Sequence, residues 1–513
     1  MAEHEIDGTP LDPVDTAWLH MEDPTNLMMV TGIYVFDGPL DFARLKDTAR
    51  YRMAERFPRL THRVVAKGSS ATWEPDPTFD IDAHIHRVAL PSPGDARTLR
   101  EMVSDLMSTP LDFSKPLWQF HLLENFGEGS VVLLRIHHCI GDGVALVHVM
   151  LSSTDPVPDA PWPTAPVTPH PHAGHPRDRI TSLVDGVNSM MKKTRKVTGA
   201  LIQEGVETVL HPSHLLELAQ DLSEGASILT KLLLKPPDPD TVLKGRLGTS
   251  KRAAWSAPIP LDEVKAVGRA NHATVNDILV AAVAGAIRRY LEGRGESIQG
   301  IEINAMVPVN LRPPGEADLL GNRFGLVYLA LPVGTADPGE RLLIVKEQMD
   351  ELKASPEPFV VFQILGALGV APKEIADLMV EMFGKKSTAV LTNVIGPKTP
   401  IWFAGGRVRT AMFWVPQSGR MGIGVSIFSY AGEVVLGVGS DARLVPDPEA
   451  ITTAFTEEFA MIKKLCAPAA APKKRPARKE GGTTPSRGGP ASKRRGTGGG
   501  SGSSRGGGRG SRR

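Results

Sequence analysis

Seven residues, HHCIGDG at positions 137–143, bring two histidines, a cysteine and an aspartate together among glycines. Histidine is the side chain whose ordinary pKa lets it take up and return a proton near neutral pH. An alcohol is a poor nucleophile until its proton is removed, and a positioned base that removes it accelerates attack by roughly 10²–10⁴-fold. We therefore interpret this heptad as an acid–base site that activates a hydroxyl group.

Other roles for the heptad are weighed against this one. Successive strand residues point to opposite faces, so His137 and His138 would not chelate one ion if a strand continues through them. No Gly-x-Ser-x-Gly nucleophile turn is present near the heptad, and Cys139 is a weak candidate for a covalent nucleophile. The histidines could also be core residues, with Asp142 capping a helix. Direct transfer between two bound substrates, without a metal, fits these residues better.

The sequence around the heptad predicts a strand, a loop and a helix. Residues 131–135 are largely apolar and begin with two β-branched residues, which favours a buried strand. Residues 139–141 form the predicted turn, and Gly143 opens a helix that is apolar almost throughout. Catalytic side chains are often carried by loops at strand ends, so this arrangement suits the proposed chemistry.

The remaining patterns predict an α/β (α+β) chain with two lobes, 1–154 and 244–466. In the first lobe we expect helices at 42–57 and 98–107 and strands at 117–123 and 131–137. In the second lobe we expect a helix from Leu261, helices at 275–290 and 448–464, and strands at 252–259, 301–307, 326–331, 407–414, 422–430 and 433–439.

The segment 155–243 separates the two predicted lobes. Residues 155–178 are rich in proline and histidine and are typical of an extended linker, although the histidines also raise the possibility of metal binding. Apolar residues then recur every three or four positions from 180 to 235, which predicts amphipathic helices. Those helices either bridge the lobes or lie at a membrane interface, because basic residues cluster beside apolar ones at 192–196.

Composition limits the environment of the protein. The chain has 513 residues and two cysteines, which is too few for a disulfide framework and suits a reducing cytosol. The first residues lack the basic and apolar regions of a signal peptide. A membrane-spanning helix needs about 20 apolar residues, and the longest strongly apolar stretch, 278–287, is shorter. We expect a cytoplasmic protein, either soluble or peripherally bound to a membrane or lipid droplet.

Charge is unevenly distributed along the chain. Residues 467–513 contain thirteen Lys or Arg and one Glu, a net charge of +12, whereas the whole chain carries +1. The rest of the chain is therefore acidic, at −11. The tail has almost no large apolar residues and is predicted to be disordered. It could contact anionic lipid, bind nucleic acid nonspecifically, or only improve solubility.

The heptad and several other segments resemble one enzyme family. The pattern His-His-x-x-x-Asp-Gly resembles the signature of the coenzyme A-dependent acyltransferase superfamily, which includes chloramphenicol acetyltransferase and peptide-synthetase condensation domains. Other segments narrow the resemblance to the bacterial wax ester synthase/diacylglycerol acyltransferase family: Leu11–Asp15, Pro116-Leu117-Trp118, Asn276-Asp277, Gly321-Asn322-Arg323 and Thr392–Pro397. The resemblance covers about residues 8–466, with these segments in the family's order.

The resemblance implies two chloramphenicol-acetyltransferase-like lobes, joined by a helical linker, with a tunnel between them. It implies that His138 is the general base, that His137 assists or is structural, and that Asp142 holds the loop, through an arginine that the sequence does not identify. Gly143 would allow close packing there. The implied substrates are acyl-coenzyme A and a diacylglycerol or long-chain alcohol, with no cofactor and no metal.

The supporting motifs keep structural alternatives. Trp118 is either a core residue or a substrate wall, and Pro116 either supports the site or sets the entry of a strand. Asn276, beside Asp277, either caps a helix or serves the site, by polarising the thioester carbonyl or by holding the active-site wall. Asn393 either serves the site or belongs to a turn before Gly396-Pro397.

Two other functions stay open. A superfamily acyltransferase could use a carrier-protein thioester or a polyketide alcohol instead. The fold could also serve a non-enzymatic protein that binds lipid surfaces.

Overall fold

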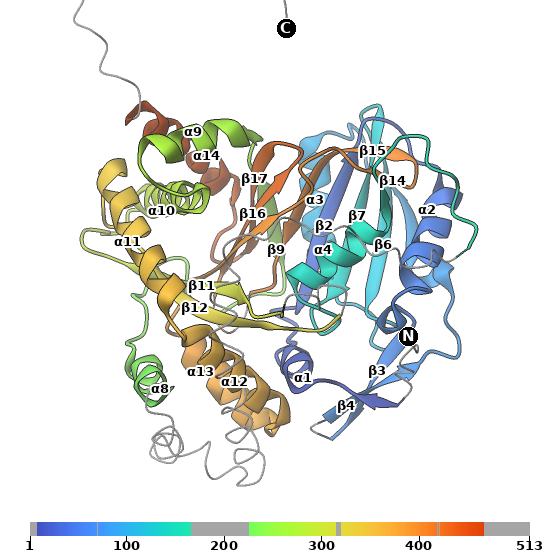
Figure 1. The fold of residues 1–513 in the computed structure, drawn as a ribbon, viewed down its shortest axis with the longest axis horizontal. Coiled ribbons are helices and arrows are strands. Elements are labelled where there is room, and N and C mark those ends of the chain that lie inside the picture. Colours follow the sequence, from blue (N-terminus) through green and yellow to red (C-terminus); the bar gives the residue numbers. More distant parts are fainter. Residues whose placement is uncertain are drawn as a thin grey trace, which may run out of the picture. The chain divides into compact units, whose positions relative to one another are not determined.

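The computed structural model describes residues 8–165 and 225–465, apart from residues 69, 314–319, 418 and 420. Its described strands form two seven-stranded mixed sheets and one small three-stranded sheet. Figure 1 shows the two large sheets side by side, with the early, blue part of the chain in one and the later, orange part mainly in the other. The mixed α/β character predicted from the sequence is confirmed.

The first large sheet carries the strand that ends at the heptad. Its order is β5-β6-β7-β2-β15-β14-β8. The strands are β2 (Met29–Phe36), β5 (Ile85–Ala89), β6 (Trp118–Phe126), β7 (Gly129–His137), β8 (Thr154–Asp155), β14 (Trp402–Phe403) and β15 (Gly406–Trp414). Strand β7 lies between β6 and β2 and pairs antiparallel with both. The heptad therefore begins at the end of an interior strand of the sheet.

The second large sheet has the order β10-β17-β16-β13-β11-β12, with β9 also paired to β17. Its strands are β9 (Lys251–Trp255), β10 (Ile259–Pro260), β11 (Ile303–Asn310), β12 (Phe324–Leu331), β13 (Ala389–Ile395), β16 (Ile423–Tyr430) and β17 (Glu433–Asp441). The small sheet joins β1 (Thr9–Pro10), β4 (Ser70–Pro75) and β3 (His62–Lys67).

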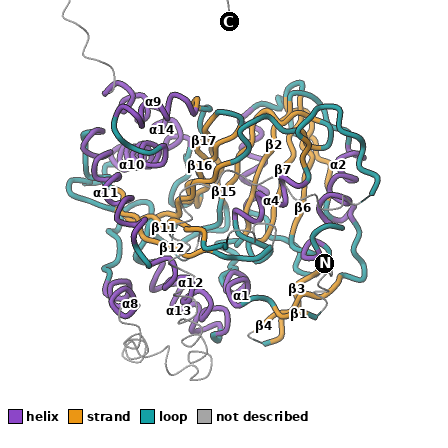
Figure 2. The backbone as a smooth tube through the Cα atoms, in the orientation of Figure 1, coloured by secondary structure: helices purple, strands orange, loops and turns teal. Residues whose placement is uncertain are grey.

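Helices cover the sheets (Figures 1 and 2). Near the first sheet lie α1 (Pro13–His20), α2 (Phe42–Ala49) with a π-helical turn after it (Arg50–Ala54), α3 (Ala96–Met107) and α4 (Gly143–Ser152). Later come α8 (Gly225–Leu234), α9 (Leu261–Ala270), α10 (Val275–Gly293), α11 (Pro338–Ala354), α12 (Glu357–Val370), α13 (Lys373–Gly384) and α14 (Glu449–Leu465). Helix α10 is buried almost all round, as its sequence predicts.

Most predicted elements are present with ends shifted by a few residues, but the strand predicted at 252–259 is wrong as a single element. It divides into β9 and β10, which both pair with β17. Between them, the backbone N–H of Ser256 donates to Leu436 O, and Pro258 has no N–H to continue a ladder.

The second half of the chain contributes strands to both large sheets. Strand β15 pairs antiparallel with β2, so that Trp414 faces Thr31 and Ala411 faces Tyr34. Strand β14 pairs with β8, which directly follows α4. The predicted lobe boundaries at 154 and 244 stay predictions, but residues 244–466 are not confined to the second sheet. Because β14 and β15 belong to the first sheet, the second half of the chain takes part in both large sheets.

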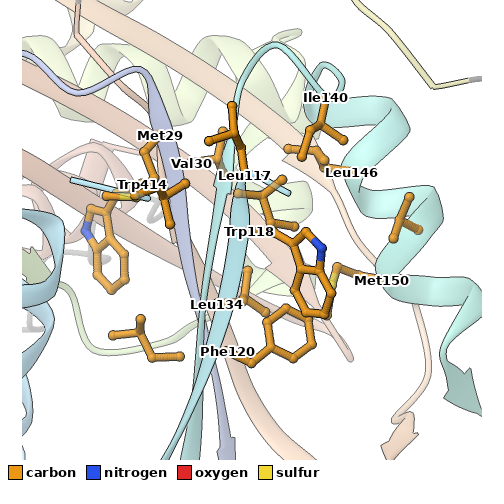
Figure 3. Packing of buried hydrophobic residues seen from close by; sticks show 14 of the residues in the cluster. Met29, Val30, Leu117, Trp118, Phe120, Leu134, Ile140, Leu146, Met150 and Trp414 are labelled. Atoms are coloured by element: carbon orange, nitrogen blue, oxygen red, sulfur yellow. The ribbon is translucent and has the colours of Figure 1, made fainter. Parts of the chain in front are cut away.

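Two hydrophobic cores follow the two sheets. The first is built on the first sheet and on helices α1, α3 and α4, and the second surrounds α10 and α14. Figure 3 shows part of the first core, where side chains of β6 and β7 meet Leu146 and Met150 of α4. Since α4 begins at the heptad, its packing here anchors the loop.

Several predictions fall on residues outside the described part. They are most of the linker from 166 onward, the amphipathic pattern up to 224, and the basic tail at 467–513. Within the described helices, none is long and apolar enough to cross a membrane.

Candidate active site

The heptad forms the turn between β7 and α4. His137 is the last residue of β7, and Gly143 is the first residue of α4. Asp142 is the N-cap of α4, because its Oδ1 accepts the backbone N–H of Ala145 at 2.9 Å. The strand, turn and helix predicted around the heptad are therefore all observed.

A cavity of about 560 Å³ opens beside the heptad, between the two large sheets. Its walls come from β2, β7, α4 and β15 on one side and from α10, β11, β12 and β13 on the other. Most lining residues are apolar, and polar side chains are few: Tyr34, His138, Asp142, Asn276, Asn310, Thr392 and Asn393. Val144 and Ile395 line it and are exposed, so the cavity opens there.

His138 lies against this cavity with only 7% of its surface exposed. Trp18 stacks on the imidazole with ring centroids 4.0 Å apart, and Phe324 approaches to 5.8 Å. The Nδ1 atom lies 2.9 Å from Asn322 Oδ1. Burial lowers the pKa of His138 to about 4, against a smaller opposing effect of the Asp142 carboxylate. The ring is thus neutral at physiological pH, as a general base must be.

Asn322 connects His138 to a buried ion pair. Its side-chain Nδ2 donates to the backbone O of His138 and to Asp15 Oδ1, both at 2.8 Å. The other carboxylate oxygen of Asp15 accepts Arg59 Nη1 at 2.7 Å. Arg59 also donates to the backbone O of Cys139 and Ile140 inside the heptad. Segments far apart in the chain therefore meet at His138.

Asp142 is held from the other side of the loop. Its Oδ2 accepts Arg312 Nη2 and the backbone N–H of Arg323, each at 2.9 Å. Arg312 also donates to Gly321 O at 2.8 Å. Arg312 is therefore the arginine that the family resemblance implied without identifying. Both side chains of the pair are almost fully buried, so the ion pair is shielded from solvent.

His137 points away from the cavity. Its Nδ1 accepts the backbone N–H of Cys139 at 3.1 Å, so this atom carries no proton. The opposite atom, Nε2, lies 3.5 Å from a Glu22 carboxylate oxygen, and Phe113 meets the ring edge-on. His137 does not line the cavity, and its contacts hold the end of β7.

The predicted Asn276 and Asn393 come together at the cavity wall. Asn393 Nδ2 donates to Asn276 Oδ1 at 2.8 Å. Asn276 is not a helix cap, because Thr274 caps α10 and forms a capping box with Asp277. Asp277 is buried away from the cavity wall in that cap. Asn393 lies in strand β13 rather than in a turn.

The Pro-Leu-Trp motif lies in the core. Trp118 has no exposed surface, stacks on His84 at 4.6 Å, and donates from Nε1 to Leu60 O at 2.7 Å. Figure 3 shows its ring among the apolar side chains of the first core. Pro116 and Trp118 do not line the cavity. Their link to the heptad is the sheet, since His137 N–H donates to Leu117 O.

The expectation that Gly143 allows close packing is wrong. A Cβ at Gly143 would meet nothing within 4 Å, because the residue borders the cavity. The close approach occurs instead at Gly141, where a Cβ would come 3.1 Å from Ala145 Cβ and 3.4 Å from Gly321 N. The tight turn thus rests on the first glycine of the heptad's pair.

Sequence reasoning missed the residues around His138 and Asp142: Asp15, Trp18, Arg59, Arg312 and Asn322. Two signals were present, because Asp15 and Asn322 belong to segments that carried the family resemblance, although they had no assigned role. Nothing in the local sequence marks Arg59 or Trp18. Among the described residues, no three His, Cys, Asp or Glu side chains lie close enough to hold a metal ion.

Comparisons with known proteins agree with the motif evidence. The family model "Wax ester synthase/diacylglycerol acyltransferase catalytic domain" matches residues 11–279, and the model "WS/DGAT C-terminal domain" matches residues 320–463. A Mycobacterium tuberculosis protein named as a probable diacylglycerol O-acyltransferase is 30% identical over 85% of this chain and 94% of its own length. A second protein with that name from the same organism is 26% identical over 88% and 95%.

Solved structures show the same fold. The wax ester synthase/diacylglycerol acyltransferase from Marinobacter aquaeolei VT8 matches with a TM-score of 0.63 at 22% identity, over 89% of this chain and 99% of that one. The first condensation domain of a calcium-dependent antibiotic synthetase matches with a TM-score of 0.56 at 15% identity, over 90% and 96%. The predicted two-lobed, chloramphenicol-acetyltransferase-like class is confirmed.

Proposed function

We propose that this chain, which belongs to the wax ester synthase/diacylglycerol acyltransferase family, transfers a long-chain acyl group from acyl-coenzyme A to a diacylglycerol hydroxyl. The product would be a triacylglycerol. Long-chain alcohols are the second acceptor class, which would give wax esters. Both acceptors present one hydroxyl on a long apolar body, which suits a mostly apolar cavity with few polar groups.

The observation that carries this proposal is the buried, neutral His138 at the wall of that cavity. Its Nδ1 is engaged by Asn322, and among the described residues nothing hydrogen-bonds Nε2. An unprotonated nitrogen beside an apolar cavity is the group that a hydroxyl nucleophile needs. The mostly apolar lining offers few groups that could hold water, which would otherwise compete with the acceptor alcohol.

The reaction then needs no covalent enzyme intermediate. His138 Nε2 takes the hydroxyl proton while the alcohol oxygen forms a bond to the thioester carbonyl carbon. The resulting tetrahedral intermediate collapses with cleavage of the carbon–sulfur bond. The proton on Nε2 passes to the departing sulfur, so coenzyme A leaves as the thiol and the histidine returns to its neutral state. Acyl-coenzyme A is a substrate here, and no cofactor or metal takes part.

The negative charge that develops on the thioester oxygen needs a hydrogen-bond donor. The side-chain oxygen of Asn276 accepts a hydrogen bond from Asn393. The Asn276 amide nitrogen lies at the cavity wall, and its contact with another described residue is a long one, to Met349 sulfur at 4.0 Å. This nitrogen is therefore available as a donor. We assign this donor role to Asn276. Such a donor commonly contributes about 10²–10³-fold to the rate.

One competition assay tests the substrate assignment. Purified full-length protein is given radiolabelled palmitoyl-coenzyme A with dioleoylglycerol and hexadecanol together, and products are separated by thin-layer chromatography. We expect labelled triacylglycerol, with or without wax ester. Wax ester alone would make the alcohol the acceptor and overturn the diacylglycerol assignment. A parallel reaction replaces the donor with a palmitoyl carrier protein, and faster transfer from that donor would contradict the use of acyl-coenzyme A.

We also propose peripheral association with a membrane or lipid-droplet surface, because diacylglycerol is held in such surfaces. A flotation assay with vesicles that contain dioleoylglycerol tests it. Protein that stays in the bottom fraction with these vesicles would contradict the association.

A further inference from the structure

We propose that Asn322 and Asp15 are positioning residues that hold His138 in one tautomer, with the proton on Nδ1 and the lone pair on Nε2. This inference rests on the proposed function, since it explains how His138 is kept ready as a base. It concerns neither substrate contact nor the Asp142–Arg312 pair. Asn322 and Asp15 act only through the imidazole ring.

The orientation of the Asn322 amide follows from its partners. The side-chain nitrogen lies 2.8 Å from the backbone O of His138 and 2.8 Å from Asp15 Oδ1, and both of these atoms are acceptors. An amide oxygen in that position would face two acceptors. The nitrogen therefore belongs there, and the amide oxygen faces His138 Nδ1 at 2.9 Å. An amide oxygen only accepts, so Nδ1 must carry the proton.

Asp15 holds Asn322 in this orientation. Its Oδ1 accepts both the side-chain and the backbone N–H of Asn322, at 2.8 and 2.9 Å. Its Oδ2 accepts Arg59 Nη1 at 2.7 Å. The Asp15 side chain has no exposed surface, and burial raises its pKa while Arg59 and Asn322 oppose that rise. All three neighbouring groups are donors, so both oxygens of the carboxylate accept hydrogen bonds.

An amide between the carboxylate and the imidazole has a distinct consequence. A carboxylate that bonded His138 directly would favour the protonated ring and raise its pKa. Here the neutral amide fixes the tautomer, and the Asp15 charge stays one residue farther away. The charged or titratable groups that face His138 are Asp142, His137 and, behind Asn322, Asp15. Trp18 and Phe324 complete its surroundings with aromatic rings.

The same network offers a sharp perturbation. Asn322→Ala removes the amide oxygen that accepts from His138 Nδ1 and the amide nitrogen that donates to Asp15 Oδ1. The hydrogen bond to Asn322 then no longer fixes which ring nitrogen carries the proton, so the tautomer with the proton on Nε2, where the ring cannot act as a base, becomes populated. In serine proteases, loss of the correct histidine tautomer lowers kcat by about 10⁴-fold.

A matched control lies elsewhere in the fold. Asn304 repeats the same arrangement, because its backbone N–H donates to Asp238 Oδ2 at 2.7 Å and its side-chain nitrogen donates to Asp238 Oδ1. Asn304 does not line the cavity. Asn304→Ala therefore removes a comparable pair of hydrogen bonds to an aspartate, at a part-buried position, without touching His138.

The decisive experiment is nitrogen-15 NMR of histidine-labelled full-length protein, with the His138 signals identified by their loss in His138→Gln. In the wild type we expect a protonated Nδ1 and an unprotonated Nε2 at pH 7. We expect Asn322→Ala to give a signal from the tautomer with its proton on Nε2 and to lower kcat by about 10-fold or more. Asn304→Ala should change neither. A proton on Nε2 in the wild type would overturn the inference, whether or not the protein transfers acyl groups.

A second variant guards against misfolding of Asn322→Ala. Asn322→Asp keeps the size of the side chain but places a second carboxyl group 2.8 Å from Asp15 Oδ1, where the two carboxyls must share a proton. Part of their negative charge then lies beside the imidazole, so we expect the acid limb of the kcat/KM profile to move to higher pH. An unchanged limb in Asn322→Asp together with an unchanged tautomer in Asn322→Ala would contradict the positioning role. Activity lost in His138→Gln tests the base itself, so the two failures can be told apart.

Discussion

His138 combines deep burial with one fixed hydrogen bond, and this combination determines how it titrates. Burial of the neutral ring lowers its pKa to about 4, and the Asp142 carboxylate compensates only in part. An ordinary histidine titrates near 6.5. His138 is therefore a weaker base than an ordinary histidine, and its ring stays unprotonated over the whole physiological pH range.

The pH dependence of catalysis should show this shift. We expect kcat/KM for palmitoyl-coenzyme A to stay level from about pH 8 to about pH 5 and to fall toward pH 4, since a proton on Nε2 blocks the base. Initial rates at each pH, with circular dichroism to confirm folding, provide the measurement. Half-loss of activity near pH 6.5 would mean that His138 titrates as an exposed histidine.

Stability should respond to the same pKa shift. As the pH falls from about 6.5 toward 4, the unfolded chain binds a proton at this residue before the folded one does. The free energy of unfolding therefore decreases over that range. Urea unfolding of His138→Gln beside the wild type measures the share of His138, and we expect a smaller decrease in the variant. Equal slopes would show that His138 has an ordinary pKa in the folded protein.

The Asp142–Arg312 pair should matter more than other ion pairs, because it is buried. Arg312→Ala would leave the Asp142 carboxylate without its cation, and we expect a loss of about 3–5 kcal/mol in the free energy of unfolding. Urea unfolding measures it. In Arg87→Ala, whose partner Glu124 and whose own side chain are 31% and 59% exposed, the loss should be much smaller, because solvent screens that pair. Equal losses would refute the distinction.

At the start of helix α10, two nearby residues, Thr274 and Asn276, have different expected roles, one structural and one chemical. Thr274 caps the helix, whereas Asn276, two residues on, lines the cavity. Thr274→Ala should lower the free energy of unfolding by about 1 kcal/mol and leave kcat unchanged. Asn276→Ala should leave stability within about 0.5 kcal/mol and lower kcat by about 10²–10³-fold. Thermal unfolding and initial rates of both variants distinguish the roles, and an Asn276→Ala protein with wild-type kcat would remove Asn276 from the mechanism.

Elements with a strong local pattern could be predicted from the sequence. The apolar run before the heptad and the apolar helix after it appear as β7 and α4, and the long apolar pattern from 275 appears as α10. Strand β13 was missed, because Gly396 and Pro397 directed attention to a turn that begins only after Ile395. The division of β9 from β10 depends on pairing with β17, which no local pattern reveals.

At the scale of the whole molecule, the site is assembled from contacts that span most of the chain. Asp15 and Asn322 are separated by 307 positions, and His138 and Asn322 by 184. Strand β15 enters the sheet of the first half beside β2, which brings its residues to the cavity wall. Periodicity and spacing describe neighbours along the chain, so they pointed to His138 but not to the network of side chains that orients its ring.

The strong charge contrast along the chain leads to a prediction for lipid binding. Removal of 467–513 takes away a net charge of +12 and leaves residues 1–466 at −11. Both matched family models end before this tail. We expect the shortened protein to keep its kcat on detergent-dispersed substrates and to lose binding to anionic vesicles, an effect that salt should mimic in the full chain. Equal vesicle binding by both proteins would exclude the tail as the lipid contact. Tight binding of the tail to nucleic acid would indicate nucleic acid, and not lipid, as its partner.

The central claim is that His138 is the base of an acyl transfer from acyl-coenzyme A to diacylglycerol. The most direct measurement is the rate of labelled triacylglycerol formation from palmitoyl-coenzyme A and dioleoylglycerol by purified wild-type and His138→Ala proteins with matching circular dichroism spectra. The account predicts product from the wild type and a loss of at least 100-fold in the variant. A folded His138→Ala protein that forms triacylglycerol at the wild-type rate would contradict it.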